Sequence, residues 1–200
     1  MDGFDGRCVT DCEQCPDLVA SRSQIVNGVG PDDAALVFVG EAPGATEDEE
    51  GEPFVGRSGS VLDDALADAG VDREAVRITN CVRCRPPENR DPTTAELANC
   101  RGYLEREIET VDPTLVVTLG KVPSEHLLDR SVGITKEAGD VVECRLGDRA
   151  QRVMLSMHPA ATLYDASQRE GFEETIAAAV ELAGLGDGNG GDDQSRLGEF

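Results

Sequence analysis

The amino-acid sequence predicts an α/β protein, a three-layer α/β/α sandwich with a central four-stranded parallel sheet. Two observations lead to this fold class. Four short apolar runs rich in β-branched residues alternate along the chain with longer segments of helical periodicity. Runs that are apolar on both faces are typical of strands in a parallel sheet that helices cover on both sides. At 200 residues, the chain is long enough to bury one such core.

The predicted strands all end in residues suited to contacting a ligand. The strands are predicted at residues 35–40, 76–80, 114–119 and 152–156. A glycine or a polar side chain stands at or just after each end: Gly40 and Glu41, Asn80, Gly120, and His158. Because ligands of parallel sheets bind beyond the carboxyl ends of the strands, these residues predict a site at that edge.

Four segments carry the periodicity of amphipathic helices. They are predicted at residues 58–69, 93–110, 121–128 and 172–183. The second opens on Thr93 with Glu96 three residues later, which is the pattern of a capping box. A hairpin-like segment at 141–146 is expected to decorate the sheet before the fourth strand.

The chain is predicted to form one domain and a tail. Residues 1–183 contain every strand and helix, and their N-terminal segment carries the first cysteines. Residues 184–200 are rich in Gly and Asp and show no apolar period, so they are predicted to be a disordered acidic tail.

The charge is the most unusual global property. Forty acidic residues against 18 basic ones give a net charge of −22, which by itself argues against a nucleic-acid partner. The acids are spread along the whole chain, and 16 of the 18 bases are arginines. This pattern favours adaptation to high internal salt, where the Debye length falls to ~3 Å and distant acids scarcely repel phosphates. The charge therefore predicts a halophilic source and does not exclude DNA.

The sequence predicts a cytoplasmic protein with a metal or cluster site. The chain has no run of apolar residues long enough for a membrane span, and its N-terminus lacks the basic and apolar regions of a signal peptide. In a reducing compartment its seven cysteines are not expected to form disulfides. A Cys12-x2-Cys15 pair with Cys84 and Cys100 can supply four thiolates, which suits structural zinc and a [4Fe–4S] cluster equally. Cys81 and Cys144 lie in strand-like contexts and are expected to be buried apolar residues.

Taken together, these residues resemble the family 4 uracil-DNA glycosylases, the iron–sulfur branch of their superfamily. The resemblance covers roughly residues 8–182 and is carried in order by Gly40-Glu41-Ala42-Pro43-Gly44, Glu47-Asp48, Gly51-Glu52-Pro53-Phe54-Val55-Gly56, Ile78-Thr79-Asn80, Cys84-Arg85-Pro86-Pro87-Glu88-Asn89-Arg90, Glu96, Cys100 and His158-Pro159. It implies a monofunctional enzyme that hydrolyses the N-glycosidic bond of uracil in DNA, leaving an abasic site for base excision repair. It also implies a [4Fe–4S] cluster on Cys12, Cys15, Cys84 and Cys100.

The resemblance implies a role for each residue of the base pocket. Asn80 would pair with uracil O4 and N3–H, Phe54 would stack on the base, and Ala42 would offer a backbone N–H to a uracil carbonyl. Glu47 would lie against uracil C5 and exclude the methyl group of thymine. Without the resemblance, Phe54 would read as a core residue and Asn80 as a side chain that satisfies a turn.

Two residues are implied to be catalytic. His158 would donate a hydrogen bond to uracil O2 as negative charge develops, whereas the other histidine, His126, is expected to be structural. Glu41 would orient the attacking water. Other members of the superfamily carry Asp or Asn at the following position, where this chain has Ala42.

The implied partner is uracil-containing DNA, single- or double-stranded, bound by a monomer. Ser58 and Gly59 at a helix start, and Arg85 near the cluster, would contact DNA phosphates. The alternative for Ser58 is a simple N-cap. The sequence leaves open which strand type or mismatch is preferred, whether other deaminated bases are removed, and whether the tail contacts a replication clamp.

Two other functions compete with the glycosylase. One is a protein that captures uracil sites in DNA without turnover, as some relatives do through a histidine in a basic inserted loop. Residues 85–94 contain neither such a loop nor a histidine. The other is an electron-transfer protein, which would not need Asn80 and His158 at the strand ends.

Overall fold

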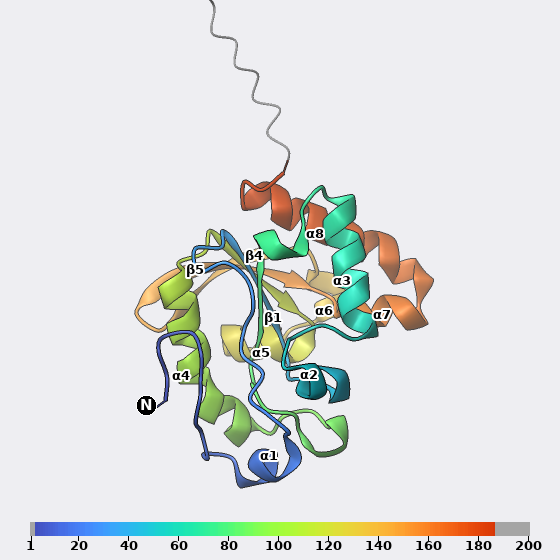
Figure 1. Cartoon of the computed structure of the whole chain (residues 1–200). Coiled ribbons are helices and arrows are strands. Elements are labelled where there is room, and N and C mark those ends of the chain that lie inside the picture. The colour runs from blue at the N-terminus through green and yellow to red at the C-terminus, as the bar shows by residue number, and fades with distance from the viewer. Residues whose placement is uncertain (1–2, 187–200) are drawn as a thin grey trace, which may run out of the picture.

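The computed structural model describes residues 3–186 (Figure 1). The predicted tail at 184–200 therefore lies almost wholly outside the described residues, which include only Gly184 to Gly186 of it. Within the described part of the chain, no helix has both the length and the apolar character needed to cross a membrane.

The sheet contains five strands in the order β2-β1-β3-β5-β4. They are β1 (Leu36–Gly40), β2 (Arg77–Asn80), β3 (Leu115–Leu119), β4 (Val141–Leu146) and β5 (Arg149–Ser156). The four predicted strands correspond to β1, β2, β3 and β5, and neighbouring members of this set pair in parallel. The mixed α/β class is confirmed.

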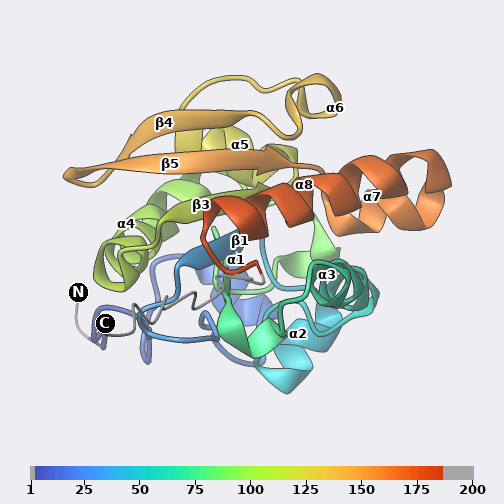
Figure 2. The same cartoon turned by 90° about the horizontal axis from the view of Figure 1, so that it is seen from above.

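The prediction of a four-stranded, purely parallel sheet is wrong, because β4 is a fifth strand. It pairs antiparallel with β5 over the whole segment that was expected only to decorate the sheet. Exposed and partly buried residues alternate along most of β4, as in an edge strand with one face in water. Figure 2 shows the β4–β5 hairpin along one edge of the sheet, on the side away from α1 and α2.

Helices cover both faces of the sheet. Leu36 and Phe38 of β1 belong to one apolar cluster, together with side chains of α3 and α8. Val37 and Val39 belong to the opposite cluster, together with side chains of α4 and α5. This alternation follows from the two-residue period of a strand, and it establishes the three-layer packing.

The four long helices agree with the predicted segments to within a few residues, and the short helices were not predicted. The helices are α1 (Pro16–Ser21), α2 (Ala45–Glu50), α3 (Arg57–Asp68), α4 (Thr94–Val111), α5 (Lys121–Leu128), α6 (Ile134–Glu137), α7 (Pro159–Tyr164) and α8 (Arg169–Leu182), with short 3-10 turns that include η2 (Pro87–Asn89). Helices of one or two turns contain too few apolar positions to show a period. The capping box of α4 is confirmed: Thr93 Oγ1 accepts from Glu96 N at 3.2 Å, and Glu96 Oε2 accepts from Thr93 N at 2.7 Å.

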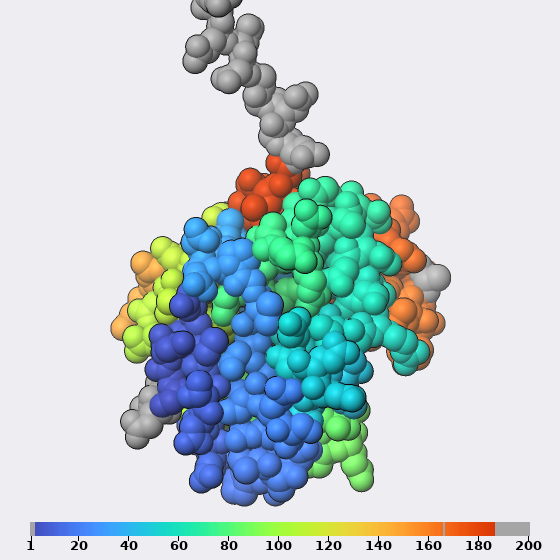
Figure 3. All heavy atoms as spheres, viewed as in Figure 1, coloured from blue at the N-terminus to red at the C-terminus, as the bar shows by residue number. Residues whose placement is uncertain are grey.

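The N-terminal segment covers the free edge of β2. Val29 forms an isolated antiparallel bridge with Ile78, and Val26 N donates to Arg83 O at 2.8 Å. The Phe4 ring packs edge-on against Tyr103 of α4, with centroids 5.1 Å apart. Figure 3 shows this blue segment lying against the yellow-green α4. The strand edge is thus protected from pairing with another chain.

A fully buried carboxylate joins these parts. Glu107 of α4 accepts from Arg77 Nε and from Arg83 Nη2, each at 2.7 Å, and from Thr79 Oγ1 at 2.9 Å. Arg83 Nη1 also donates to Asn27 Oδ1 at 2.7 Å, which ties the N-terminal segment to the same group. Glu107 is 0% exposed, so removing its charge leaves the buried Arg83 without an acidic partner among residues 3–186 and leaves Arg77 only the exposed Asp32, 3.7 Å away.

Replacing Glu107 by Gln is therefore expected to lower the free energy of unfolding by about 3 kcal/mol or more. Urea denaturation at fixed salt measures the change. Glu109→Gln is the matched control, because Glu109 lies on the same helix in an exposed pair with Arg106. The two variants should differ by most of that amount. Equal stability of the two proteins would show that the buried network contributes little.

Candidate active site

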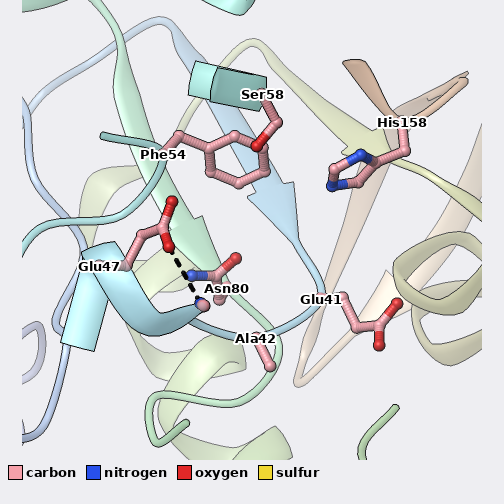
Figure 4. A pocket seen from close by; sticks show the side chains of 8 residues that line it. Glu41, Ala42, Glu47, Phe54, Ser58, Asn80 and His158 are labelled. Carbon is pink, nitrogen blue, oxygen red and sulfur yellow. Dashed lines mark hydrogen bonds between the residues drawn. The ribbon is translucent and has the colours of Figure 1, made fainter. Parts of the chain in front are cut away.

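A pocket of about 180 Å³ opens at the carboxyl ends of β1, β2 and β5 (Figure 4). Its lining residues come from segments that are far apart in the sequence: Glu41, Ala42, Gly44, Glu47, Phe54, Ser58, Asn80 and His158. The structure therefore brings together seven of the nine residues that the sequence assigned to the catalytic, base-binding or phosphate-binding groups, and it adds Gly44. The remaining two, Gly59 and Arg85, do not line the pocket.

Asn80 presents an unsatisfied acceptor in this pocket. It is the last residue of β2 and is 2% exposed. Its Oδ1 atom is buried and has no hydrogen-bond partner among residues 3–186. Because a buried amide oxygen without a donor is costly, this atom is well placed to receive an N–H group from a ligand.

His158 presents a donor. Its Nδ1 atom accepts a hydrogen bond from Ala160 N at 3.1 Å, where the histidine caps the N-terminus of α7. Burial lowers the pKa of His158 below its ordinary value, and the Glu47 carboxylate opposes this shift. A neutral imidazole whose Nδ1 accepts must carry its proton on Nε2, so the free side of the ring can donate.

Phe54 is held in an unusual backbone conformation. Its φ is 55°, in the left-handed region that is uncommon for a residue other than glycine. The Phe54 and His158 rings lie tilted at 33° with centroids 5.8 Å apart (Figure 4). Strain of this kind is often found at binding sites.

Two glycines leave room for Phe54. A Cβ atom on Gly40 would come within 2.4 Å of the Phe54 ring and 2.3 Å of Asn80 Oδ1. A Cβ atom on Gly59 would come within 1.8 Å of the Phe54 carbonyl oxygen. Gly59 is buried beneath Phe54, so its structural role is to let α3 pack against that residue.

Glu47 is fixed in place by the backbone. Its Oε2 atom accepts from Gly44 N at 3.1 Å, and its Oε1 atom accepts from Gly56 N at 3.2 Å. In Figure 4 its carboxylate lies beside the Asn80 amide, across the pocket from Glu41. Because both oxygens are held, Glu47 forms a rigid wall next to Asn80.

Glu41 lies at the side of the pocket, and its carboxyl points away from Phe54 and Ser58 (Figure 4). Burial, reinforced by the nearby Asp91 carboxylate, raises the pKa of Glu41 to about 7. A carboxyl with a pKa near neutrality is suited to exchanging protons with water at physiological pH. Asp91 was missed in the sequence, where an Asp in a polar loop carries no special signal.

The three predicted phosphate-binding residues do not form one group. Ser58 lines the pocket in the first turn of α3, and Gly56 is the N-cap of that helix, so the N-cap alternative for Ser58 is wrong. Arg85 lies instead in a separate surface depression with Asp17 and Ser21, and its Nε donates to Asn89 Oδ1 at 2.7 Å.

Cys12, Cys15, Cys84 and Cys100 line a single small cavity, which also contacts Leu18 and Arg22. Arg22 Nη1 donates to Cys84 Sγ at 2.9 Å, and Asn99 Nδ2 donates to Cys15 Sγ at 3.3 Å. Among residues 3–186, no group of three or more His, Cys, Asp or Glu side chains is placed to hold a metal ion. The four thiols thus border a shared space without converging on a single point.

Two further cysteines, Cys81 and Cys144, lie apart from this cavity. Cys81 is 1% exposed and packs in the apolar cluster beneath α4, and Cys144 is partly buried on β4 beside it. Burial raises the pKa of both thiols, to about 11 for Cys144. His126 is partly buried, and its buried Nε2 atom has no hydrogen-bond partner in the described chain.

Comparison with known proteins identifies the family. The family model of the uracil DNA glycosylase superfamily matches residues 27–181, which include the whole pocket. The chain belongs to the uracil-DNA glycosylase superfamily.

Within this superfamily, the chain is similar to type-4 uracil-DNA glycosylases. It is 40% identical over 182 residues to the type-4 enzyme of Archaeoglobus fulgidus, covering 89% of this chain and 91% of the relative. It is 41% identical over 160 residues to that of Thermotoga maritima, covering 80% and 81%. A type-5 uracil-DNA glycosylase of Thermus thermophilus is 31% identical over 215 residues, covering 88% and 96%. The resemblance found in the sequence is confirmed.

In this uracil-DNA glycosylase fold, Gly40→Ala is expected to lower the free energy of unfolding by about 1–3 kcal/mol, because the new methyl group collides with Phe54 and Asn80. Gly171→Ala in α8 is the control, since its Cβ would meet only Met157 Cε at 4.0 Å. That variant should be as stable as the unmodified protein or slightly more stable. Urea denaturation measures the free energy of unfolding of both variants. An unchanged value for Gly40→Ala would show that Phe54 and Asn80 can move aside at little cost.

Proposed function

We propose that this protein is a monofunctional uracil-DNA glycosylase. It hydrolyses the N-glycosidic bond of uracil in DNA, releases free uracil and leaves an abasic site that starts base excision repair. The observation that carries this proposal is the buried, unpartnered Asn80 Oδ1 in a pocket that also holds a donor histidine. The names of the relatives, type-4 uracil-DNA glycosylase, support the same activity.

Base recognition follows from the hydrogen-bonding pattern of uracil. Asn80 Oδ1 accepts from N3–H, and the Asn80 amide nitrogen donates to O4. Cytosine presents an acceptor at N3 and an amine at C4, so it meets Asn80 with both groups inverted and leaves buried polar atoms unpaired. The base must leave the DNA stack to reach this pocket.

Three further residues shape the base pocket. Phe54 stacks on the base, and Ala42 supplies a backbone N–H to a uracil carbonyl. Glu47, fixed by two backbone amides beside Asn80, lies against C5 and leaves no room for the methyl group of thymine. The rigid setting of Glu47 is what makes exclusion effective, since a mobile side chain would yield to the methyl group.

The reaction breaks the bond between C1′ of the deoxyribose and N1 of uracil. The bonding electrons leave with the base, which departs as an anion, and the sugar develops oxocarbenium character. His158 donates from Nε2–H to uracil O2 as the negative charge grows, a contact that strengthens in the transition state. Water, oriented by Glu41, forms a bond to C1′ and loses a proton to solvent, and the departing uracil anion takes up a proton from solvent, which completes the hydrolysis.

The DNA strand is proposed to run across the start of α3. Ser58 and Gly59 lie in the first turn of this helix, where backbone N–H groups lack helical partners and can bind a phosphate. Arg85 would contact a phosphate farther along, beside the cysteine cavity. The protein is proposed to bind the DNA as a monomer.

The four cysteines around one cavity are proposed to hold a [4Fe–4S] cluster. Each thiolate of such a cluster binds a different iron atom, so the sulfurs surround the group and need not meet at one ion. The four thiols that line one cavity provide the donor set that such a cluster needs. The Arg22 guanidinium, which already donates to Cys84 Sγ, would compensate the charge of a bound thiolate. The cluster would cross-link three parts of the chain: the N-terminal segment through Cys12 and Cys15, the loop that follows β2 through Cys84, and helix α4 through Cys100.

Replacing Cys84 by Ala is expected to abolish iron binding and visible absorption and to lower the unfolding temperature. Cys144→Ala is the matched control, because Cys144 lies away from the cavity on β4 and its loss should leave the iron content unchanged. Metal analysis for iron and zinc, with an absorption spectrum, measures both variants. Stoichiometric zinc in the unmodified protein would contradict the cluster, and an unchanged unfolding temperature in Cys84→Ala would contradict its structural role.

Replacing Asn80 by Ala is expected to lower kcat/KM for uracil release by about 100-fold or more, because the site loses both contacts that read the base. The assay uses a uracil-containing oligonucleotide across salt concentrations, followed by alkali. The unfolding temperature and iron content of the variant provide the control, and neither should fall. Activity within threefold of the unmodified protein would show that another group reads the base.

A further inference from the structure

One arginine faces the cysteine cavity without an acidic partner. Among the described residues that line the cavity, Arg22 is the only one with a permanent charge. Its guanidinium donates from Nη1 to Cys84 Sγ at 2.9 Å and from Nη2 to Cys12 O at 2.8 Å. The chain carries 40 acidic residues, yet none of those within residues 3–186 forms an ion pair with Arg22. A cation left without an acid in so acidic a protein points to a negatively charged group inside the cavity.

The backbone is fixed on both sides of this arginine. Arg22 is the C-cap of α1, and its N donates to Leu18 O at 2.9 Å. The next residue, Ser23, donates from N to both carboxylate oxygens of the buried Asp48, each at 2.9 Å. Since α1 begins directly after Cys15, one short helix places a thiol and the guanidinium at the same cavity (Figure 1). The guanidinium is therefore held in position before any group binds.

The two hydrogen bonds of Arg22 join separate parts of the chain. Cys12 belongs to the N-terminal segment, whereas Cys84 lies in the loop that follows β2. Asn99 of α4 also donates to a cavity sulfur, Cys15 Sγ, at the longer distance of 3.3 Å, but its side chain is neutral and the residue is exposed. The charge and the bridging contact thus both come from Arg22.

We propose that Arg22 is a positioning residue for the [4Fe–4S] cluster, which joins Cys84 to the Cys12 backbone and offsets the negative charge of the bound group. The inference rests on the cluster proposed above. Four thiolates give such a cluster a net negative charge, which the apolar Leu18 and Val19 at the cavity do not stabilise. A guanidinium bonded to a ligand sulfur stabilises this charge, and it stabilises the reduced form most, because reduction adds a further negative charge. Arg22 therefore slows the loss of iron and raises the reduction potential.

Arg22→Gln tests the inference in the purified full-length protein with its cluster, because it removes the charge and leaves a neutral amide. Release of iron to a chelator is expected to be about 10-fold faster than from the unmodified protein. The reduction potential, measured at an electrode, should become more negative, since the reduced form loses its cation. In that measurement the electrode supplies one electron and no bond is broken. An arginine that served only the packing of α1 would lower the unfolding temperature without moving the potential.

Arg22→Lys is the conservative variant. It restores the charge but offers one nitrogen for two partners, so its potential and its rate of iron release should lie between those of Arg22→Gln and the unmodified protein. If Arg22→Gln is isolated without iron, Arg22→Lys decides the matter, because it must still lose iron faster than the unmodified protein. Arg106→Gln is the matched control, since it removes the same charge from an exposed position on α4, where Arg106 pairs with Glu109. It should change neither reading.

A potential and a rate of iron release in Arg22→Gln equal to those of Arg106→Gln would overturn the inference, and the cluster and the glycosylase activity would still stand. An unchanged rate in Arg22→Lys would overturn it in the same way if Arg22→Gln holds no iron. Zinc in place of iron in the unmodified protein would instead reject the proposed cluster, and the inference with it.

Discussion

The structure depends on one buried charge. Glu107 lies in the C-terminal part of α4 and binds Arg77, Thr79 and Arg83 on the strand and loop beside it. None of these charges could remain in the interior alone, since a buried unpaired ion costs several kcal/mol. The network therefore exists only when α4, β2 and the N-terminal segment are all in place. It couples the packing of three segments that are distant in sequence.

This network lies between the two sites. Thr79 immediately precedes Asn80, which lines the pocket, and Arg83 immediately precedes Cys84, which borders the cysteine cavity. The same short stretch of chain thus positions a pocket-lining amide at one end and a cavity-lining thiol at the other. A second hydrogen bond links segments next to the two sites. Asp48, which follows Glu47 in α2, accepts from Ser23 N at 2.9 Å, and Ser23 follows Arg22 of the cysteine cavity. These contacts connect the segments that line the pocket with the segments that line the cysteine cavity.

Much of the fold could be predicted because its core strands are apolar on both faces and its long helices carry clear stripes. The fifth strand was misjudged, since an alternating, half-exposed segment such as Val141–Leu146 gives a weak signal. Glu107 did leave a trace: it falls on the apolar stripe of α4 beside Leu104 and Ile108. Arg77 and Arg83 likewise interrupt apolar runs. Residues of opposite charge within segments that are otherwise apolar, such as Glu107 and Arg77, could have indicated a buried ion-pair network.

The candidate site was accessible to prediction wherever a residue belongs to an ordered motif, as Asn80 and His158 do. Gly59 shows the limit, because its packing against the Phe54 carbonyl depends on three-dimensional proximity that no local pattern records. Asp91 could not be predicted for the same reason, because its proximity to Glu41 depends on how the loop folds. The halophilic origin inferred from the charge of −22 stays a prediction about habitat.

The central claim is that the pocket releases uracil by hydrolysis and does nothing further to the strand. Chromatography with mass detection of the products from oligonucleotides carrying a single uracil, thymine or cytosine tests it most directly. The account predicts free uracil from the first oligonucleotide alone, with an abasic strand that stays intact until alkali is added. Absence of free uracil at every salt concentration, or a protein–DNA adduct that survives SDS, would contradict it.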